Sequence, residues 1–213
     1  MISPLNETPP TLDTLIARLE DDTGVLKSAP IKAALRAVPR ARCIRARYLS
    51  EAYEDYPVPV GFGQTISQPT TVVFMLELLQ AHKGDRVLEV GSGSGWVTAL
   101  LAHLVGAQGK VYGVELVPEL VAFGRKNLKK YALPNATIAQ AGAVLGLPGE
   151  APFDRILVSA SAQELPGELV QQLKDGGTLV IPIGDTIYHI EKREGGEIKK
   201  TPYPGFAFVP LIT

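Results

Sequence analysis

The stretch Arg86-Val-Leu-Glu-Val-Gly-Ser-Gly-Ser-Gly-Trp96 decides the fold. Residues 86–90 form a short run of strand length with β-branched residues, and a helical pattern begins near Trp96. Three glycines, Gly91, Gly93 and Gly95, lie between the two. Glycines at such a junction permit a tight turn and let a ligand approach the backbone without meeting a Cβ atom. The stretch therefore predicts a binding site where a strand of an α/β protein ends.

Strands and helices are expected to alternate downstream of Asp85, which itself is expected only to start the first strand. Alternation of this kind is typical of a doubly wound, mostly parallel sheet. The expected strands cover 86–90, 110–115, 136–140, 155–160 and 177–183, and the expected helices cover about 96–105, a stretch beginning near Pro118, and about 165–173. Residues 186–203 predict an antiparallel hairpin, because Gly195 and Gly196 separate two strand-like runs. The closing apolar run 206–212 predicts one more strand.

Upstream of the sheet, helical spacing of apolar residues predicts short helices over about 11–20 and 31–38, and a further helix over about 70–79. Residues 49–69 are too rich in Pro and Gly for regular structure and too long for an idle connection, so they predict a functional loop. We expect residues 1–80 to form N-terminal helices and an active-site loop packed on a main domain of residues 81–213.

Composition narrows the classes of function. The chain has 213 residues, of which 21 are basic and 22 acidic, so it lacks the positive charge of a dedicated nucleic-acid binder. The single cysteine, Cys43, excludes a disulfide framework and suits a reducing compartment. The N-terminus shows no leader-like pattern, and no apolar run has the length of a membrane span. These features predict a cytoplasmic protein that binds neither nucleic acid nor membrane.

An acid strengthens the binding-site prediction. Glu115 ends the second expected strand 20 residues after Gly95, where a carboxylate can accept hydrogen bonds from both hydroxyls of a ribose. The alternative is a solvated surface carboxylate. Glu89 precedes the turn and either orients it or faces a charged amino group of the ligand. The glycine spacing is G-x-G-x-G and differs from the dinucleotide pattern G-x-G-x-x-G.

Four segments resemble the protein-L-isoaspartate O-methyltransferase family: AYEDYPVPVGFGQTISQP (52–69), VLEVGSGSGW (87–96), EAPFDRILVSASAQELP (150–166) and LKDGGTLVIPIG (173–184). FVPL (208–211) is a further match. The motif Gly-x-Gly-Gln-Thr-Ile-Ser-x-Pro distinguishes this family from other methyltransferases of the fold, since all of them share the glycine turn. The resemblance implies a Rossmann-like methyltransferase fold, S-adenosylmethionine as methyl donor, S-adenosylhomocysteine as product, and isoaspartyl proteins and peptides as substrates.

The resemblance also implies roles for individual residues. The motif serine, Ser67, together with Thr65, holds the substrate carboxylate; the alternative is that the two hydroxyls only cap the helix beginning near Thr70. An isoaspartyl carboxylate is ionised at neutral pH and needs no general base. The implied cofactor-binding residues are Glu89, Gly91, Ser92, Gly93, Gly95, Glu115, Leu116, Gly142 and Ala143. The implied substrate-binding residues are Val60, Gln64, Ile66, Ser159 and Ala160, although Val60 and Ile66 fit an ordinary core equally well, and residues 53–59 would form a flap over the peptide.

The sequence departs from the family where Gly-Asp-Gly usually follows the third strand. Here Ala141-Gly142-Ala143 takes its place, so the acid that binds the adenine amino group is missing. The loss of one hydrogen bond to a charged group predicts cofactor binding weaker by about 1.5 to 3 kcal/mol, unless a backbone carbonyl or Gln140 compensates. The backbone amide of Ala143 remains a donor for a ring nitrogen.

Two other functions fit the same motifs. One is methylation of a different acceptor, such as RNA or a small carboxylate, because fold alone does not fix the substrate. The other is a non-catalytic protein that binds isoaspartyl peptides or nucleosides. His82, His103 and His189 have no metal-ligand spacing, so no metal is expected, and the family implies a monomer.

Overall fold

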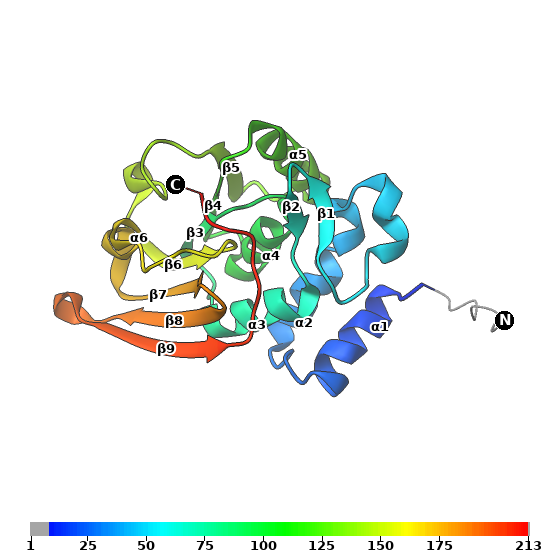
Figure 1. Cartoon of the computed structure of the whole chain (residues 1–213), viewed down its shortest axis with the longest axis horizontal. Helices are drawn as coiled ribbons and strands as arrows, with labels where there is room; N and C mark the ends of the chain where they lie inside the picture. Colours follow the sequence, from blue (N-terminus) through cyan, green and yellow to red (C-terminus); the bar gives the residue numbers. More distant parts are fainter. Residues whose placement is uncertain (1–8, 213) are drawn as a thin grey trace.

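The computed structural model describes residues 9–212. The start of the predicted segment 1–80, which is also the start of the stretch inspected for a leader, lies outside the described residues. Figure 1 shows a central sheet with the N-terminal helices beside it and a hairpin at one edge. The helices are α1 (Leu12–Ala17), α2 (Ala29–Ala37), α3 (Pro69–Leu79), α4 (Trp96–Val105), α5 (Pro118–Leu128) and α6 (Gly167–Gln172). The strands are β1 (Val58–Gly61), β2 (Gln64–Ile66), β3 (Arg86–Val90), β4 (Lys110–Glu115), β5 (Ala136–Gln140), β6 (Phe153–Val158), β7 (Leu173–Ile183), β8 (Thr186–Lys192) and β9 (Ile198–Pro204).

The main sheet has seven strands in the order β5-β4-β3-β6-β7-β8-β9. Strands β3 to β7 pair in parallel, whereas β8 and β9 pair antiparallel, which confirms the predicted doubly wound sheet and its C-terminal hairpin. Chain order reverses between β3 and β6, because the sheet grows outward from β3 in one direction and from β6 in the other. Ligands of open α/β sheets bind at such a point, beyond the carboxyl ends of the strands.

Each face of the sheet has its own apolar core. One cluster joins alternate strand residues such as Val87, Val111 and Ile138 to helices α1 to α5. The other joins the intervening residues, such as Leu88 and Ile156, to α6 and the segment before β6. Successive side chains of a strand point to opposite faces, so a parallel strand covered on both faces is mostly apolar, as Val87, Leu88 and Val90 of β3 are. The first cluster contains residues from both 9–80 and 81–212.

Three predictions of local structure are wrong in detail. Residues 206–212 form no strand; one bridge pairs Pro210 with Ser161, because the segment leaves the sheet after β9 and crosses its carboxyl edge. Residues 49–69 contain the antiparallel pair β1 and β2, in which Pro59 is tolerated because the pair has no further strand beside it. The helix expected over 165–173 is shorter, since Leu173 already pairs with Phe153 as part of β7.

Candidate functional site

A pocket opens at the carboxyl ends of β3, β4 and β6, where the strand order reverses. The glycine turn forms its floor, strand β2 and Ser67 form one wall, and residues 141–146 form another. The C-terminal segment crosses this edge (Figure 1) and adds residues 209–212 to the lining. It is attached there by two backbone bonds, Ser161 N to Val209 O at 2.8 Å and Leu211 N to Ser161 O at 2.7 Å.

The glycine turn is locked to the sheet and to α5. The amides of Gly91 and Ser92 both donate to the carbonyl of Val114, at 2.8 and 3.1 Å. Gly95 has φ +77°, and a Cβ atom there would stand 2.9 Å from the carbonyl oxygen of Gly124. Any larger residue at position 95 would therefore push α5 away from the turn. Gly95 does not itself line the pocket, so the structure gives it a packing function.

Glu115 ends β4 inside the pocket, with 7% of its surface exposed. Its Oε2 accepts from the amide of Gly93 at 2.8 Å, and its Oε1 accepts from the amide of Val117 at 3.0 Å. These two bonds fix the carboxylate against the glycine turn. Each oxygen keeps further lone-pair capacity, so the group can accept two hydroxyls of a ribose. Glu115 is not a solvated surface acid.

Glu89 lies beneath the turn and is 1% exposed. The hydroxyl of Thr98 donates to its Oε2. Burial raises the pKa of Glu89 to about 8; the neighbouring charge of Glu115 adds to this rise, and the Thr98 bond opposes it. Glu89 also lines the pocket, so a cation bound there would favour its ionised form.

The far end of the pocket is apolar. Leu116, Val144 and Ile212 line it with 43%, 53% and 60% of their surfaces exposed, beside Gly142 and Ala143. Within the part of the chain that the structure describes, Glu89 and Glu115 are the only charged side chains of the lining. Gln140 is exposed, does not belong to the lining, and spends its amide N–H on the carbonyl of Leu116. Because Gln140 is not part of the lining, no side-chain amide or carboxylate stands beside Gly142 and Ala143 in the described pocket.

The wall opposite carries the hydroxyls expected to hold a substrate carboxylate. Gln64, Thr65, Ile66 and Ser67 line the pocket, as do Ser159 and Ala160 at the end of β6. The capping alternative for Thr65 and Ser67 is wrong, because Asp55 caps α3 instead. Its carboxylate accepts from the amide and the hydroxyl of Thr70, at 2.9 and 2.6 Å. Neither Thr65 nor Ser67 makes a side-chain hydrogen bond within residues 9–212.

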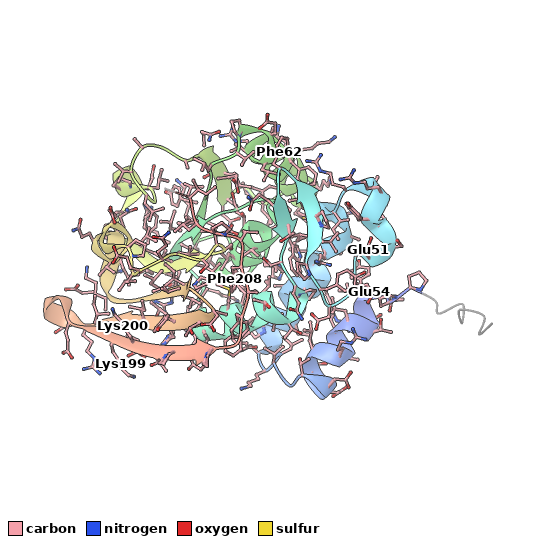
Figure 2. The ribbon with its side chains drawn as sticks, viewed as in Figure 1. Glu51, Glu54, Phe62, Lys199, Lys200 and Phe208 are labelled. Atoms are coloured by element: carbon pink, nitrogen blue, oxygen red, sulfur yellow. The ribbon has the colours of Figure 1, made fainter. Side chains whose placement is uncertain are left out.

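Some predicted site residues lie elsewhere. Val60 belongs to β1 and is fully buried on the inward face of that strand, beside Val58, and it does not line the pocket. Residues 53–59 do not line it either. Phe62, at the tip of the β1–β2 hairpin, is 55% exposed, and Figure 2 shows it far from Lys199 and Lys200 on β9.

Sequence reasoning missed two contributors. Residues 209–212 were expected in a strand, although Pro210 was a signal against regular pairing. Arg40 was not singled out at all. Its guanidinium is buried and holds the carbonyls of the loop that carries Ser67. A lone arginine before a loop gives no sequence signal of this kind.

The remaining reactive groups lie outside the pocket. Cys43 is fully buried, and burial raises the pKa of its thiol to about 11. Burial lowers the pKa of His189, which faces Glu191 at 3.8 Å on the outer strands. Across residues 9–212, no group of three or more His, Cys, Asp or Glu side chains is arranged to hold a metal ion. No helix within these residues is long and apolar enough to cross a membrane.

Comparisons with known proteins agree on one family. The family model described as protein-L-isoaspartate(D-aspartate) O-methyltransferase matches residues 11–213. A protein-L-isoaspartate O-methyltransferase of Methanopyrus kandleri is 44% identical over 94% of this chain and 90% of its own length. One from Pyrococcus horikoshii is 43% identical over 89% of this chain and 87% of its own. A solved structure from Plasmodium falciparum, described as a putative enzyme of this kind in complex with S-adenosyl-L-homocysteine, matches with a TM-score of 0.85 and 29% identity, over 95% of this chain and 99% of that one.

Proposed function

Because this chain belongs to the protein-L-isoaspartate(D-aspartate) O-methyltransferase family, we propose that it transfers a methyl group from S-adenosylmethionine to the free carboxylate of L-isoaspartyl residues in damaged proteins and peptides. The ester formed would initiate repair, and S-adenosylhomocysteine would be released. We also propose that the protein acts as a monomer in the cytoplasm, which the lone cysteine suits. The acceptor is then a protein or peptide, and no nucleic acid takes part.

One observation carries the proposal. A single pocket joins a glycine turn and a strand-end acid to the hydroxyls of Thr65 and Ser67, which lack protein partners within the described residues. The glycine turn and the strand-end acid suit a ribonucleoside, and the two hydroxyls suit a carboxylate. A nucleoside-linked donor and an acidic acceptor can therefore meet in one cavity.

The residues present fit S-adenosylmethionine. Glu115, held by two amides, would accept the ribose hydroxyls. Glu89 would face the amino group, whose positive charge would draw its pKa down from about 8. Leu116, Val144 and Ile212 would cover the adenine. When bound, the cofactor supplies an electrophilic methyl group on a sulfonium.

Positioning accounts for most of the catalysis. An isoaspartyl carboxylate is already ionised at neutral pH, so no side chain has to remove a proton. Ser67 and Thr65 would donate hydrogen bonds to one carboxylate oxygen and aim the other at the methyl group. Holding two reactants in line replaces an encounter in solution, and this is worth several kcal/mol of the barrier. The C-terminal segment would exclude water from one side of the pocket.

Two substitutions test these roles separately. Glu115→Ala is expected to raise the Kd of S-adenosylhomocysteine by about 10- to 100-fold, since hydrogen bonds to a charged group are lost. Ser67→Ala is expected to leave that Kd unchanged and to lower methyl transfer to an isoaspartyl peptide by about 10- to 100-fold. Calorimetry gives the first quantity and labelled methyl transfer the second. Exposed residues Glu119 and Ser50 provide matched controls. Two variants that behave like their controls would refute the assignment.

A further inference from the structure

Arg40 is the one arginine of the described chain that is almost completely buried, with 1% of its surface exposed. Its Cζ lies 5.7 Å from the centroid of the Trp96 ring. No Asp or Glu forms an ion pair with it within residues 9–212. Burial lowers its pKa to about 10, so the side chain keeps its charge at neutral pH. A buried cation without a carboxylate partner is costly unless other groups solvate it.

Backbone carbonyls of the active-site loop supply that solvation. Nη1 donates to Ala52 O at 3.0 Å and to Glu51 O and Glu54 O, both at 3.4 Å. Nη2 donates to Tyr56 O at 3.0 Å. It also donates to the carbonyls at the exit of the β1–β2 hairpin, Ile66 O at 3.3 Å and Ser67 O at 3.2 Å. One side chain therefore gathers both ends of the segment 51–67 at a single point.

The backbone that carries Arg40 is fastened to the cofactor side of the molecule. The indole N–H of Trp96 donates to the carbonyl of Val38 at 3.0 Å. The hydroxyl of Tyr131 donates to the carbonyl of Pro39 at 2.9 Å. Trp96 directly follows the glycine turn and begins α4, and Tyr131 follows α5. Residues 38–40 thus form a bracket, with the backbone fixed to the helices behind the cofactor site and the side chain fixed to the loop.

The carbonyls of this bracket match the two terminal nitrogens of an arginine, Nη1 and Nη2, while the buried Nε has no partner among the described residues. A planar guanidinium presents several N–H groups in a fixed plane, whereas a lysine ammonium has three and no extended plane. Buried carbonyls need donors, so an apolar replacement would leave several of them unpaired. The arrangement fixes the backbone at Ser67 with respect to Trp96, which adjoins the glycine turn.

We propose that Arg40 is a positioning residue that places Ser67 and Thr65 in register with the cofactor site. The expected effect on methyl transfer rests on the proposed function, whereas the placement of the loop rests on the hydrogen bonds described above. Arg40 does not touch either reactant, because it is not part of the pocket lining. Its loss is expected to displace the substrate hydroxyls while leaving the cofactor residues in place.

Arg40→Lys tests this proposal. Displacement of the hydroxyls by about 1 Å is expected to lower kcat/KM for an isoaspartyl peptide by about 10- to 100-fold. The Kd of S-adenosylhomocysteine should change less than about threefold, and amide hydrogen exchange within residues 51–67 should accelerate. The control is Arg36→Lys, an exposed arginine four residues away whose Nη1 pairs with the exposed Asp13 at 3.0 Å. It should leave all three quantities unchanged.

If Arg40→Lys fails to fold, Trp96→Phe takes its place, because it removes the bond to Val38 and keeps an aromatic ring under the guanidinium. Peptide kinetics and loop exchange like those of wild type would overturn the proposal. A loss of cofactor affinity as large as the loss of kcat/KM would do so too, since it would indicate general damage. If the wild type methylates no isoaspartyl peptide, the proposed function fails, and loop exchange still decides whether Arg40 positions the segment.

Discussion

Replacing Gly142 by aspartate is expected to tighten cofactor binding. The family usually has an acid at this position, as the resemblance implies, whereas this chain has Ala141-Gly142-Ala143. Gly142 lines the pocket next to Ala143, and a Cβ atom added to it would meet no heavy atom within 4 Å. Its φ lies outside the left-handed region. A side chain at this position therefore enters open space without backbone strain.

The size of the gain follows from the bond that the carboxylate would make. A hydrogen bond to a charged group contributes about 1.5 to 3 kcal/mol, which corresponds to a Kd lower by about 10- to 100-fold. The lining around Gly142 is apolar and does not include Gln140, so no side-chain carboxylate or amide of the described lining stands there to accept from the adenine amino group. Repulsion from Glu115 in the same pocket places the expected value at the lower end of this range.

Calorimetric titration with S-adenosylhomocysteine measures the gain. The matched ligand is an analogue whose purine lacks the exocyclic amino group, for which Gly142→Asp should give no improvement. Gly142→Ala, which adds only the Cβ atom, should leave both affinities as in wild type. The reasoning is refuted if the aspartate variant binds S-adenosylhomocysteine no better than wild type, or if the two ligands gain equally.

Three further substitutions probe the site. The pKa of Glu89 is about 8 in the folded protein against an ordinary value of 4.5, so the stability that its protonated form confers is complete below pH 4.5 and is lost as pH rises through 8. Glu89→Gln should remove this pH dependence, which is on the order of a few kcal/mol in the free energy of unfolding by urea between pH 5 and 8. The same fall in stability in the variant as in wild type would contradict this assignment. The Ser92 hydroxyl is buried without a partner among the described residues, so Ser92→Ala should raise the free energy of unfolding of the free protein by about 1 kcal/mol, and a clear loss of stability would show a bond not seen here. Gly95→Ala should lower the free energy of unfolding by about 1 to 3 kcal/mol, because Gly95 has a positive φ and the added Cβ would lie 2.9 Å from the carbonyl oxygen of Gly124. Gly149→Ala, where the added Cβ meets open space, should leave the free energy of unfolding unchanged.

The sheet and its cofactor edge were largely predictable from sequence. Residues 86–90, 110–115 and 136–140 match β3, β4 and β5 residue for residue, because short runs rich in β-branched residues are bounded by turn residues on either side. The placement of Glu115 was predictable as well, because the last residue of a parallel strand lies at the carboxyl edge of the sheet, where ligands bind.

The contributors that the sequence did not reveal depend on tertiary contacts. The segment 206–212 is apolar enough for a strand, yet its backbone bonds go to Ser161 and Asp185, far away in sequence. The hairpin in 49–69 was hidden by its prolines, although Val58, Val60 and Ile66 share one buried face. Arg40 is buried only because loop carbonyls converge on it from positions 11 to 27 residues away. None of these arrangements has a periodic signature.

Transfer of labelled methyl from S-adenosylmethionine to a short isoaspartyl peptide, beside the same peptide with normal aspartate, decides whether this protein is an isoaspartyl methyltransferase. We expect methylation of the isoaspartyl peptide alone, saturable and inhibited by S-adenosylhomocysteine. Methylation of neither peptide by folded protein that still binds S-adenosylhomocysteine would contradict this expectation, and would indicate either a different acceptor or a protein that only binds.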